Sequence, residues 1–215
     1  MIDKFCGYLT DRIRKEMPEV DDERAEVIQY GLQLMIGEFP KFFIMAGIAW
    51  ILGILKWTVV CFALMLPYRM YSGGFHLKTH IGCIIGTSLM YTGNAFISQL
   101  FIIPFKYKII VAIVTWIFAI IMIRIYAPAD TENIPVISKK ERKKRRLFSY
   151  VIVTVMLTAS VFIDNSIISN ILLVGVILQT FSITRIAYKI TNNKYGYEIY
   201  YSNENIVSNW NIINR

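Results

Sequence analysis

The sequence has few side chains that can act as nucleophiles, bases or metal ligands. It contains only two histidines in 215 residues, and its three cysteines, Cys6, Cys61 and Cys83, are far apart with no Cys-x-x-Cys pair. Such spacing gives neither a disulfide framework nor a zinc cluster. Two histidines and one nearby cysteine also lack a fourth metal ligand. We therefore expect no metal and no cofactor.

Acidic residues are also scarce, since 15 Asp and Glu face 23 Lys and Arg, for a net charge of +8. The basic excess lies mainly in one run, 139–146, and in the C-terminal tail. A nucleic-acid site would interleave basic residues with aromatic residues on one face, so we expect no nucleic-acid partner. The first 17 residues lack the continuous apolar core and small-residue cleavage site of a signal peptide.

Apolar residues, in contrast, are abundant and come in long runs. They make up 55% of the chain, whose mean hydropathy is +0.48. About 20 apolar residues cross a bilayer as a helix. The pattern predicts an all-α polytopic membrane protein with about six transmembrane helices. The predicted spans are 27–55, 57–68, 81–103, 109–125, 148–163 and 167–186.

The segments outside these spans complete a single membrane domain, 1–215. Residues 2–17 have helical apolar periodicity, which predicts an amphipathic helix at the membrane surface. It belongs to an amphipathic and acidic N-terminal segment, 1–24. A basic loop is expected over 126–146, and a loosely ordered polar tail over 191–215.

The basic run predicts the orientation. Lysine- and arginine-rich loops face the cytoplasm. Counting back two spans from this loop places the stretch 69–80 on the cytoplasmic face, with both termini inside the cell. The run could also contact acidic lipid or an acidic peptide.

The predicted third span, 81–103, is unusually polar. Cys83, Thr87, Asn94 and Ser98 fall on one side of the helix. Polar groups at membrane depth face protein or a wet cavity, so this side should point inward. Close helix packing at its glycines would explain the same pattern.

The stretch 68–83 holds both histidines, a Gly-Gly pair and Cys83. A cysteine protease needs a thiol and a base that removes its proton. His80 and Cys83 are neighbours at i,i+3 on a helix, so spacing favours His80. His76 would be about 10 Å away along a regular helix, and it can serve only if the chain folds back. Gly73 and Gly74 would permit such a fold. A buried packing role for Cys83 is the plain alternative.

Three further residues of this stretch have two interpretations each. Arg69 would either clamp a substrate carboxylate or anchor the end of the second span at the membrane surface. The N–H groups of Gly73 and Gly74 would either stabilise an oxyanion or simply form a turn.

The pattern Arg69-x4-Gly74-Phe75-His76-x6-Cys83, after two spans and before four, resembles the accessory gene regulator B (AgrB) family of quorum-sensing membrane peptidases. The loop YAPAD…Pro135 followed by a basic run is similar too. The resemblance implies that His76 and Cys83 form the catalytic pair, with Arg69 and Gly74 also functional. His80 is not part of the motif, and Glu38 and Asn94 are the only suggestions for a third residue.

The resemblance also implies a substrate and a reaction. A cysteine endopeptidase of the cell membrane would remove the acidic C-terminal tail of an amphipathic, AgrD-like signal propeptide. An acyl-enzyme thioester would then permit closure to a thiolactone or lactone. A homodimer is implied as well. The alternatives are a small transporter or peptide exporter lined by the polar span, and a structural subunit that docks a partner through 139–146.

Overall fold

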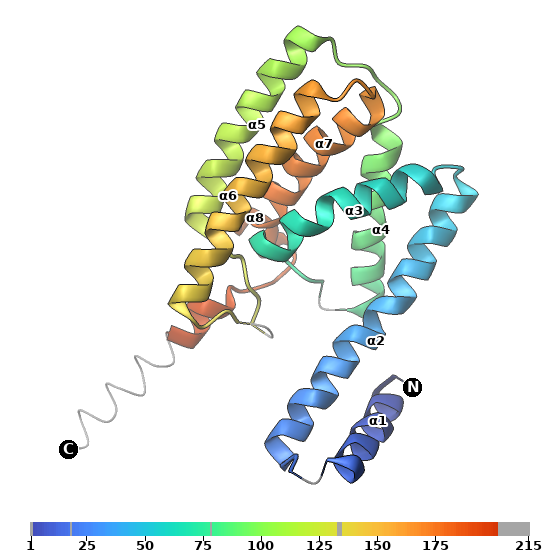
Figure 1. Ribbon diagram of the computed structural model, residues 1–215, viewed down its shortest axis with the longest axis vertical. Coiled ribbons are helices and arrows are strands. Elements are labelled where there is room, and N and C mark those ends of the chain that lie inside the picture. Colours follow the sequence, from blue (N-terminus) through green and yellow to red (C-terminus); the bar gives the residue numbers. More distant parts are fainter. Residues whose placement is uncertain (1, 18, 78, 133–134, 202–215) are drawn as a thin grey trace, which may run out of the picture.

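The structure is a computed structural model that describes residues 2–17, 19–77, 79–132 and 135–201 (Figure 1). Helices dominate these ranges, and the one isolated bridge given for them joins Gly73 to Ala129. The helices are α1 (Ile2–Glu16), α2 (Asp22–Ile51), α3 (Leu55–Ser72), α4 (His80–Ile97), α5 (Phe105–Tyr126), α6 (Lys139–Phe162), α7 (Ser166–Ser182) and α8 (Arg185–Ile190). A further helical segment begins at residue 196. The all-α fold class is thus confirmed for the described residues.

The helix boundaries follow local signals in the sequence. Asp21 caps α2, because its side chain accepts a hydrogen bond from the Arg24 N–H. The acidic patch near residue 20 therefore begins a long helix. The break before α3 lies at Gly53, whose φ of +69° favours glycine, and not at residue 56 between the predicted spans 27–55 and 57–68.

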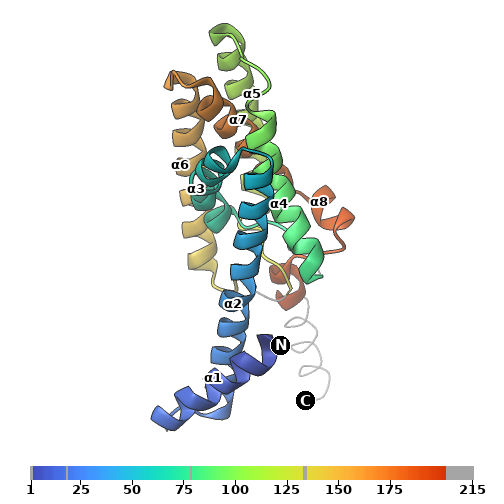
Figure 2. The same ribbon diagram turned by 90° about the vertical axis from the view of Figure 1, so that its right-hand side faces the viewer.

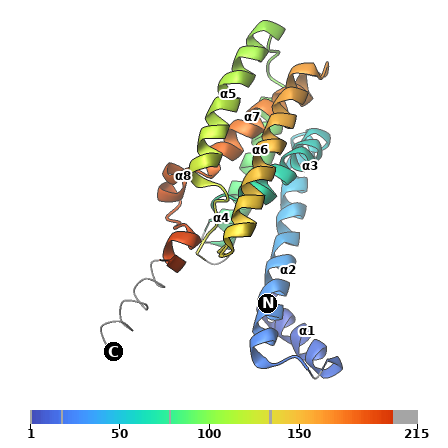
Figure 3. The same ribbon diagram turned by 60° about the vertical axis from the view of Figure 1, so that its left-hand side comes forward.

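Helices α5, α6 and α7 pack side by side, and α3 crosses α6 and α7 (Figures 1 and 3). Helix α4 lies against α3, α7 and α2 (Figure 2). The core comprises buried side chains from most of these helices, among them Met65, Tyr68, Ile123, Val153 and Leu173. All three views show α1 and the first half of α2 extending beyond the bundle as a hairpin.

Two helices, α5 and α6, are long and apolar enough to cross a membrane. Shorter apolar stretches lie in α2 (Pro40–Ile51), α4 (Ile81–Ile97) and α7 (Ser166–Ser182). Large apolar side chains on the outer side of α5, such as Val114, Ile117 and Ile121, are exposed in the protein alone. These features fit a membrane protein, whereas the number of spans stays a prediction.

Two segment predictions were wrong. The basic run 139–146 is not a loop but the beginning of α6, whose first turn is capped by Ser138. The described part of the predicted polar tail, 191–201, is ordered, because Tyr195 is buried and stacks on Tyr188 with ring centroids 4.1 Å apart. The remainder of that prediction, 202–215, lies outside the described residues. Aromatic packing against α8 supplies the apolar burial that composition alone did not indicate.

The connections of the bundle gather at two ends. The loops α3–α4 and α5–α6 meet at one end, where the Gly74 N–H donates to the Ala129 carbonyl at 2.8 Å. The segment after α7 joins them, because the Tyr188 hydroxyl donates to the Asp130 carbonyl at 3.0 Å. At the other end, the amide of Asn170 in α7 donates to carbonyls of the α4–α5 connection. The stretch 69–80 thus shares its end of the bundle with the basic run.

Candidate active site

The α3–α4 loop begins at two glycines that the fold requires. Gly73 and Gly74 have φ of +74° and +136°. A Cβ at Gly73 would overlap the carbonyl of Ala129, and one at Gly74 would overlap the Arg69 guanidinium. The Gly73 N–H donates to the Arg69 carbonyl and the Gly74 N–H to that of Ala129. Both donors are engaged within the protein, which supports the turn interpretation and leaves neither for an oxyanion in this structure.

Arg69 ties this loop to α7. Its Nη2 donates to the Phe75 carbonyl at 2.6 Å, and its Nη1 donates to the Ser182 hydroxyl at 3.1 Å. These contacts are with groups of the protein itself. The role of Arg69 toward a substrate carboxylate or the membrane surface stays a prediction.

The sequence analysis missed a polar cluster at the end of α7. The Gln179 amide donates to the Ser72 hydroxyl and to the Gly73 carbonyl, at 2.9 and 2.8 Å. The Phe75 N–H donates to the Ser182 carbonyl at 3.3 Å. The sequence feature that could have revealed this cluster is the polar group Gln179, Thr180 and Ser182 at the end of an otherwise apolar run. Polar side chains in such a place usually form buried hydrogen bonds.

The YAPAD loop is the second support of the glycine turn. Asp130, whose side chain is 1% exposed, accepts from the Val136 N–H at 2.8 Å and from Arg142 at 3.0 Å. Arg142 also donates to the Pro128 carbonyl, and Arg146 to that of Ala127. Two arginines of the basic run thus hold the segment 127–130 against Gly73 and Gly74.

Beyond Phe75 the loop folds back along the start of α4. The Leu77 side chain covers two glycines there. A Cβ added to Gly82 would lie 3.5 Å from the Leu77 Cβ, and a Cβ added to Gly86 would lie 2.9 Å from the Leu77 Cδ1. His76, just before Leu77, is exposed, and its carbonyl accepts from the Asn193 amide at 2.7 Å. This is the non-helical path that a role for His76 requires.

Cys83 lies in the first turn of α4. Its N–H donates to the Thr79 carbonyl at 2.9 Å, and the Thr79 side chain caps the helix at Gly82. The thiol is free, and the residue is half-buried. Helix α4 begins at His80, one turn before Cys83, but the His80 side chain lies outside the described part of the chain. The pairing of either histidine with Cys83 stays a prediction.

The other cysteines are packing residues. Cys6 and Cys61 are fully buried, and the Cys61 sulfur accepts from the Asn94 amide at 3.2 Å. Asn94 also donates to the Ile171 carbonyl of α7, so it is not placed to orient a histidine. Of the three cysteines, Cys83 alone is accessible. The Glu38 side chain lies outside what the structure describes.

The polar side of α4 points inward, as predicted. Asn94 and Ser98 are buried, and the Ser98 hydroxyl donates to the Asn94 side chain at 3.1 Å. The Gln99 amide donates to the Ala95 carbonyl of its own helix. Asn94 and the Ser98 carbonyl join this side to α7 through Ile171 and Asn170, which fits the packing interpretation better than a lined pathway. Within the described ranges no three His, Cys, Asp or Glu side chains are grouped to hold a metal.

The sequence is similar to proteins of one known family. The model of the accessory gene regulator B (AgrB) family matches residues 6–183. An AgrB-like protein of Listeria innocua is 30% identical over 189 residues, which cover 87% of this chain and 91% of the relative. One from Listeria monocytogenes is 29% identical over the same shares. One from Clostridium perfringens is 26% identical over 73% of this chain and 74% of its own length.

No solved structure matches the chain. The family model nevertheless spans α1 to the end of α7, including the glycine turn, His76 and Cys83. The chain belongs to the accessory gene regulator B family.

Proposed function

We propose that this protein is a cysteine endopeptidase of the cytoplasmic membrane that processes a quorum-sensing propeptide. Cys83 is the nucleophile and His76 its base. Arg69, Gly73 and Gly74 are supporting residues that hold the loop carrying His76. The substrate is an amphipathic, AgrD-like propeptide with an acidic C-terminal tail, and the product is a cyclic autoinducing peptide.

The reaction takes place in two acyl transfers. His76 accepts the Cys83 proton, and the thiolate attacks the carbonyl before the tail. The C–N bond breaks, the imidazolium gives its proton to the leaving amine, and a thioester remains on Cys83. A cysteine or serine side chain of the bound peptide then attacks the thioester. His76 takes the proton of this side chain as its oxygen or sulfur forms the ring bond. The C–S bond to Cys83 breaks, and the proton returns to the Cys83 thiolate.

One observation carries the proposal. The loop after Gly74 turns back over the first turns of α4 through the contact of Leu77 with Gly82 and Gly86. The chain around His76 thus leaves the regular helix and runs beside the start of α4, which supports a role for His76 with Cys83. The family's motif requires such a path, and the cysteine at its end is the accessible one.

The membrane arrangement is part of the proposal. About six spans, with both termini in the cytoplasm, place the site at the inner surface of the bilayer. The four exposed lysines of the basic run support this orientation through the positive-inside rule. A thioester at the edge of the lipid is partly shielded from water, which favours ring closure over hydrolysis. We also propose a homodimer, as in the family.

The test is removal of the nucleophile. Cys83→Ala should abolish tail release from a co-expressed propeptide. Cys61→Ser should retain it, because Cys61 is buried and bonded to Asn94. Tail release measured by mass spectrometry, with both variants at equal membrane abundance, decides the result. Continued release by Cys83→Ala would contradict the proposal.

A further inference from the structure

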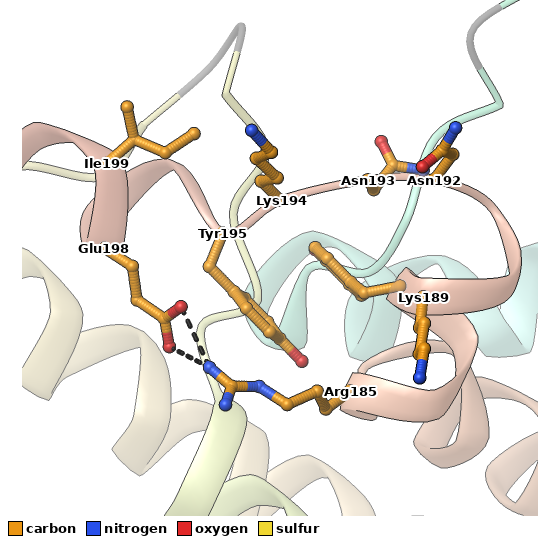
Figure 4. Close-up of a pocket in the computed structure, with 9 residues that line it drawn as sticks. Arg185, Lys189, Asn192, Asn193, Lys194, Tyr195, Glu198 and Ile199 are labelled. Atoms are coloured by element: carbon orange, nitrogen blue, oxygen red, sulfur yellow. Dashed lines mark hydrogen bonds and ion pairs between the residues drawn. The ribbon is translucent and has the colours of Figure 1, made fainter.

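A cavity of about 540 Å³ lies beside the reactive loop, in a part of the chain that the reaction above does not use (Figure 4). Its walls come from α8 and the segment that follows it. They comprise Arg185, Tyr188, Lys189, Asn192, Asn193, Lys194, Tyr195, Glu198 and Ile199. We call it the α8 pocket. Its size suits a few residues of a peptide.

The floor of the α8 pocket is fixed and uncharged. Tyr188 and Tyr195 stack nearly parallel, and their hydroxyls donate to the carbonyls of Asp130 and Ile183. Burial raises the pKa of both Tyr188 and Tyr195 above the usual value, so both remain neutral at physiological pH. The pocket therefore has a rigid apolar base whose polar groups are satisfied.

The rim, in contrast, is cationic. Arg185, Lys189 and Lys194 are exposed around the pocket, against a single acidic side chain, Glu198. Arg185 donates to both oxygens of this carboxylate, at 2.7 and 2.9 Å (Figure 4). The pocket thus already binds one carboxylate of the protein itself. Both partners of this pair are more than half exposed, so another carboxylate can replace Glu198 at little cost.

The α8 pocket adjoins the proposed base. The amide of Asn193, a wall residue, donates to the carbonyl of His76 at 2.7 Å. An extended peptide advances about 3.3–3.6 Å per residue, so a few residues lead from a bond cut near His76 into the pocket. Arg142 and Arg146 of α6 are less suitable partners, because they already bind the buried Asp130 carboxylate and the Ala127 carbonyl.

The geometry points to the α8 pocket as the binding site for an acidic peptide segment. The carboxylates of this segment pair with Arg185, Lys189 and Lys194. This identification rests on the proposed function: the segment is the part of the substrate that leaves when the peptide bond is cut. The pocket then selects acidic substrates and holds the scissile bond against His76.

Binding without turnover tests this inference. The full chain carrying Cys83→Ala is purified in detergent and titrated with a labelled glutamate-rich peptide and with its glutamine counterpart. The acidic peptide should bind more tightly, and less so at high salt. Adding Lys189→Gln and Lys194→Gln should weaken its binding roughly fivefold to tenfold. The matched change, Lys143→Gln with Lys144→Gln on α6, should leave it within about twofold.

A gain of affinity is the sharper outcome, because damage to the fold cannot produce it. Glu198→Gln removes the internal carboxylate that competes for Arg185, so it should tighten binding of the acidic peptide about twofold to fivefold. Loss of affinity in the α6 variant with none in the pocket variant would overturn the assignment. So would equal binding of the acidic and glutamine peptides.

Vesicles separate a peptide site from a lipid site. Phosphatidylglycerol vesicles should not compete with the acidic peptide more than phosphatidylcholine vesicles do, and strong competition by the former would assign the pocket to anionic lipid instead. Because Cys83→Ala cannot cut, these results stand apart from the catalytic proposal. Tail release by Cys83→Ala would refute the enzyme and leave the peptide site unchanged.

Discussion

The two halves of the stretch 69–83 differ in how the protein holds them. In the first half, Arg69 to Phe75, side chains and backbone form hydrogen bonds to α7 and to the 127–130 segment. In the second half, His76 is exposed and Cys83 half-buried. The fold thus fixes the first half and leaves His76 and Cys83, the proposed catalytic pair, more accessible. Chemical function should depend on the second half, and stability on the first.

The largest expected effect is on the rate of tail release, and it concerns the second half of the stretch, which holds His76 and Cys83. His76→Gln should lower the rate of tail release about 10²- to 10⁴-fold, because a positioned base contributes that much. His80→Gln is the matched control and should change the rate only a few fold. Initial rates from purified protein with synthetic propeptide provide the measurement. A larger loss of rate in His80→Gln than in His76→Gln would make His80 the base, as spacing on a regular helix suggests.

The next largest effect is on stability. It concerns the 127–130 segment, which supports the first half of the stretch, Arg69 to Phe75. Arg142→Met leaves the Asp130 carboxylate buried without its cation, which should lower the free energy of unfolding by about 3–5 kcal/mol. Arg145→Met breaks an exposed pair with Glu141 and should cost less than about 1 kcal/mol. Thermal unfolding in detergent measures both. Equal losses would mean that the 127–130 segment does not support the turn.

The glycine turn gives a smaller effect with a close control. Alanine at Gly73 or at Gly53 is strained by a positive φ, at about 1–2 kcal/mol. Only at Gly73 does the new methyl also meet Ala129, whereas Gly53 has open space around it. Gly73→Ala should therefore destabilise the protein by about 1–3 kcal/mol more than Gly53→Ala. Similar unfolding temperatures for the two variants would rule out the close approach at Ala129.

Much of this arrangement could be predicted from the sequence, because apolar runs and breakers determine helices locally. The helices from α3 to α7 lie near their predicted positions, and the glycine pair before His76 indicated a turn. The partners of that turn could not be predicted. Gln179 and Ser182 come within reach of Gly73 and Arg69 only after more than a hundred residues have folded.

The basic run shows why composition alone misled. Seven Lys and Arg residues in eight positions suggested a solvated loop. Lysine and arginine are good helix formers, however, and Ser138 with Glu141 begins the helix. Arg142 and Arg146 then lie one turn apart on the side that faces the 127–130 segment. The charges determine both the helix and its contacts.

The smallest effect concerns the floor of the α8 pocket. Tyr188→Phe removes the hydrogen bond to the Asp130 carbonyl and should lower the free energy of unfolding by about 1 kcal/mol. Tyr107→Phe, an exposed site on α5, should change it by less than about 0.5 kcal/mol. Unfolding in detergent compares them. No difference would mean that the link between the tail and the 127–130 segment is weak.

The most direct test of the account is capture of the acyl-enzyme. The protein is incubated with a propeptide whose ring-forming cysteine or serine is replaced by alanine, so the thioester cannot be resolved by cyclisation. Peptide mapping by mass spectrometry should find the peptide attached to Cys83, with its tail removed and the bond cleaved by hydroxylamine. Attachment at Cys6 or Cys61, or tail release with no adduct at any stage of the reaction, would contradict the account.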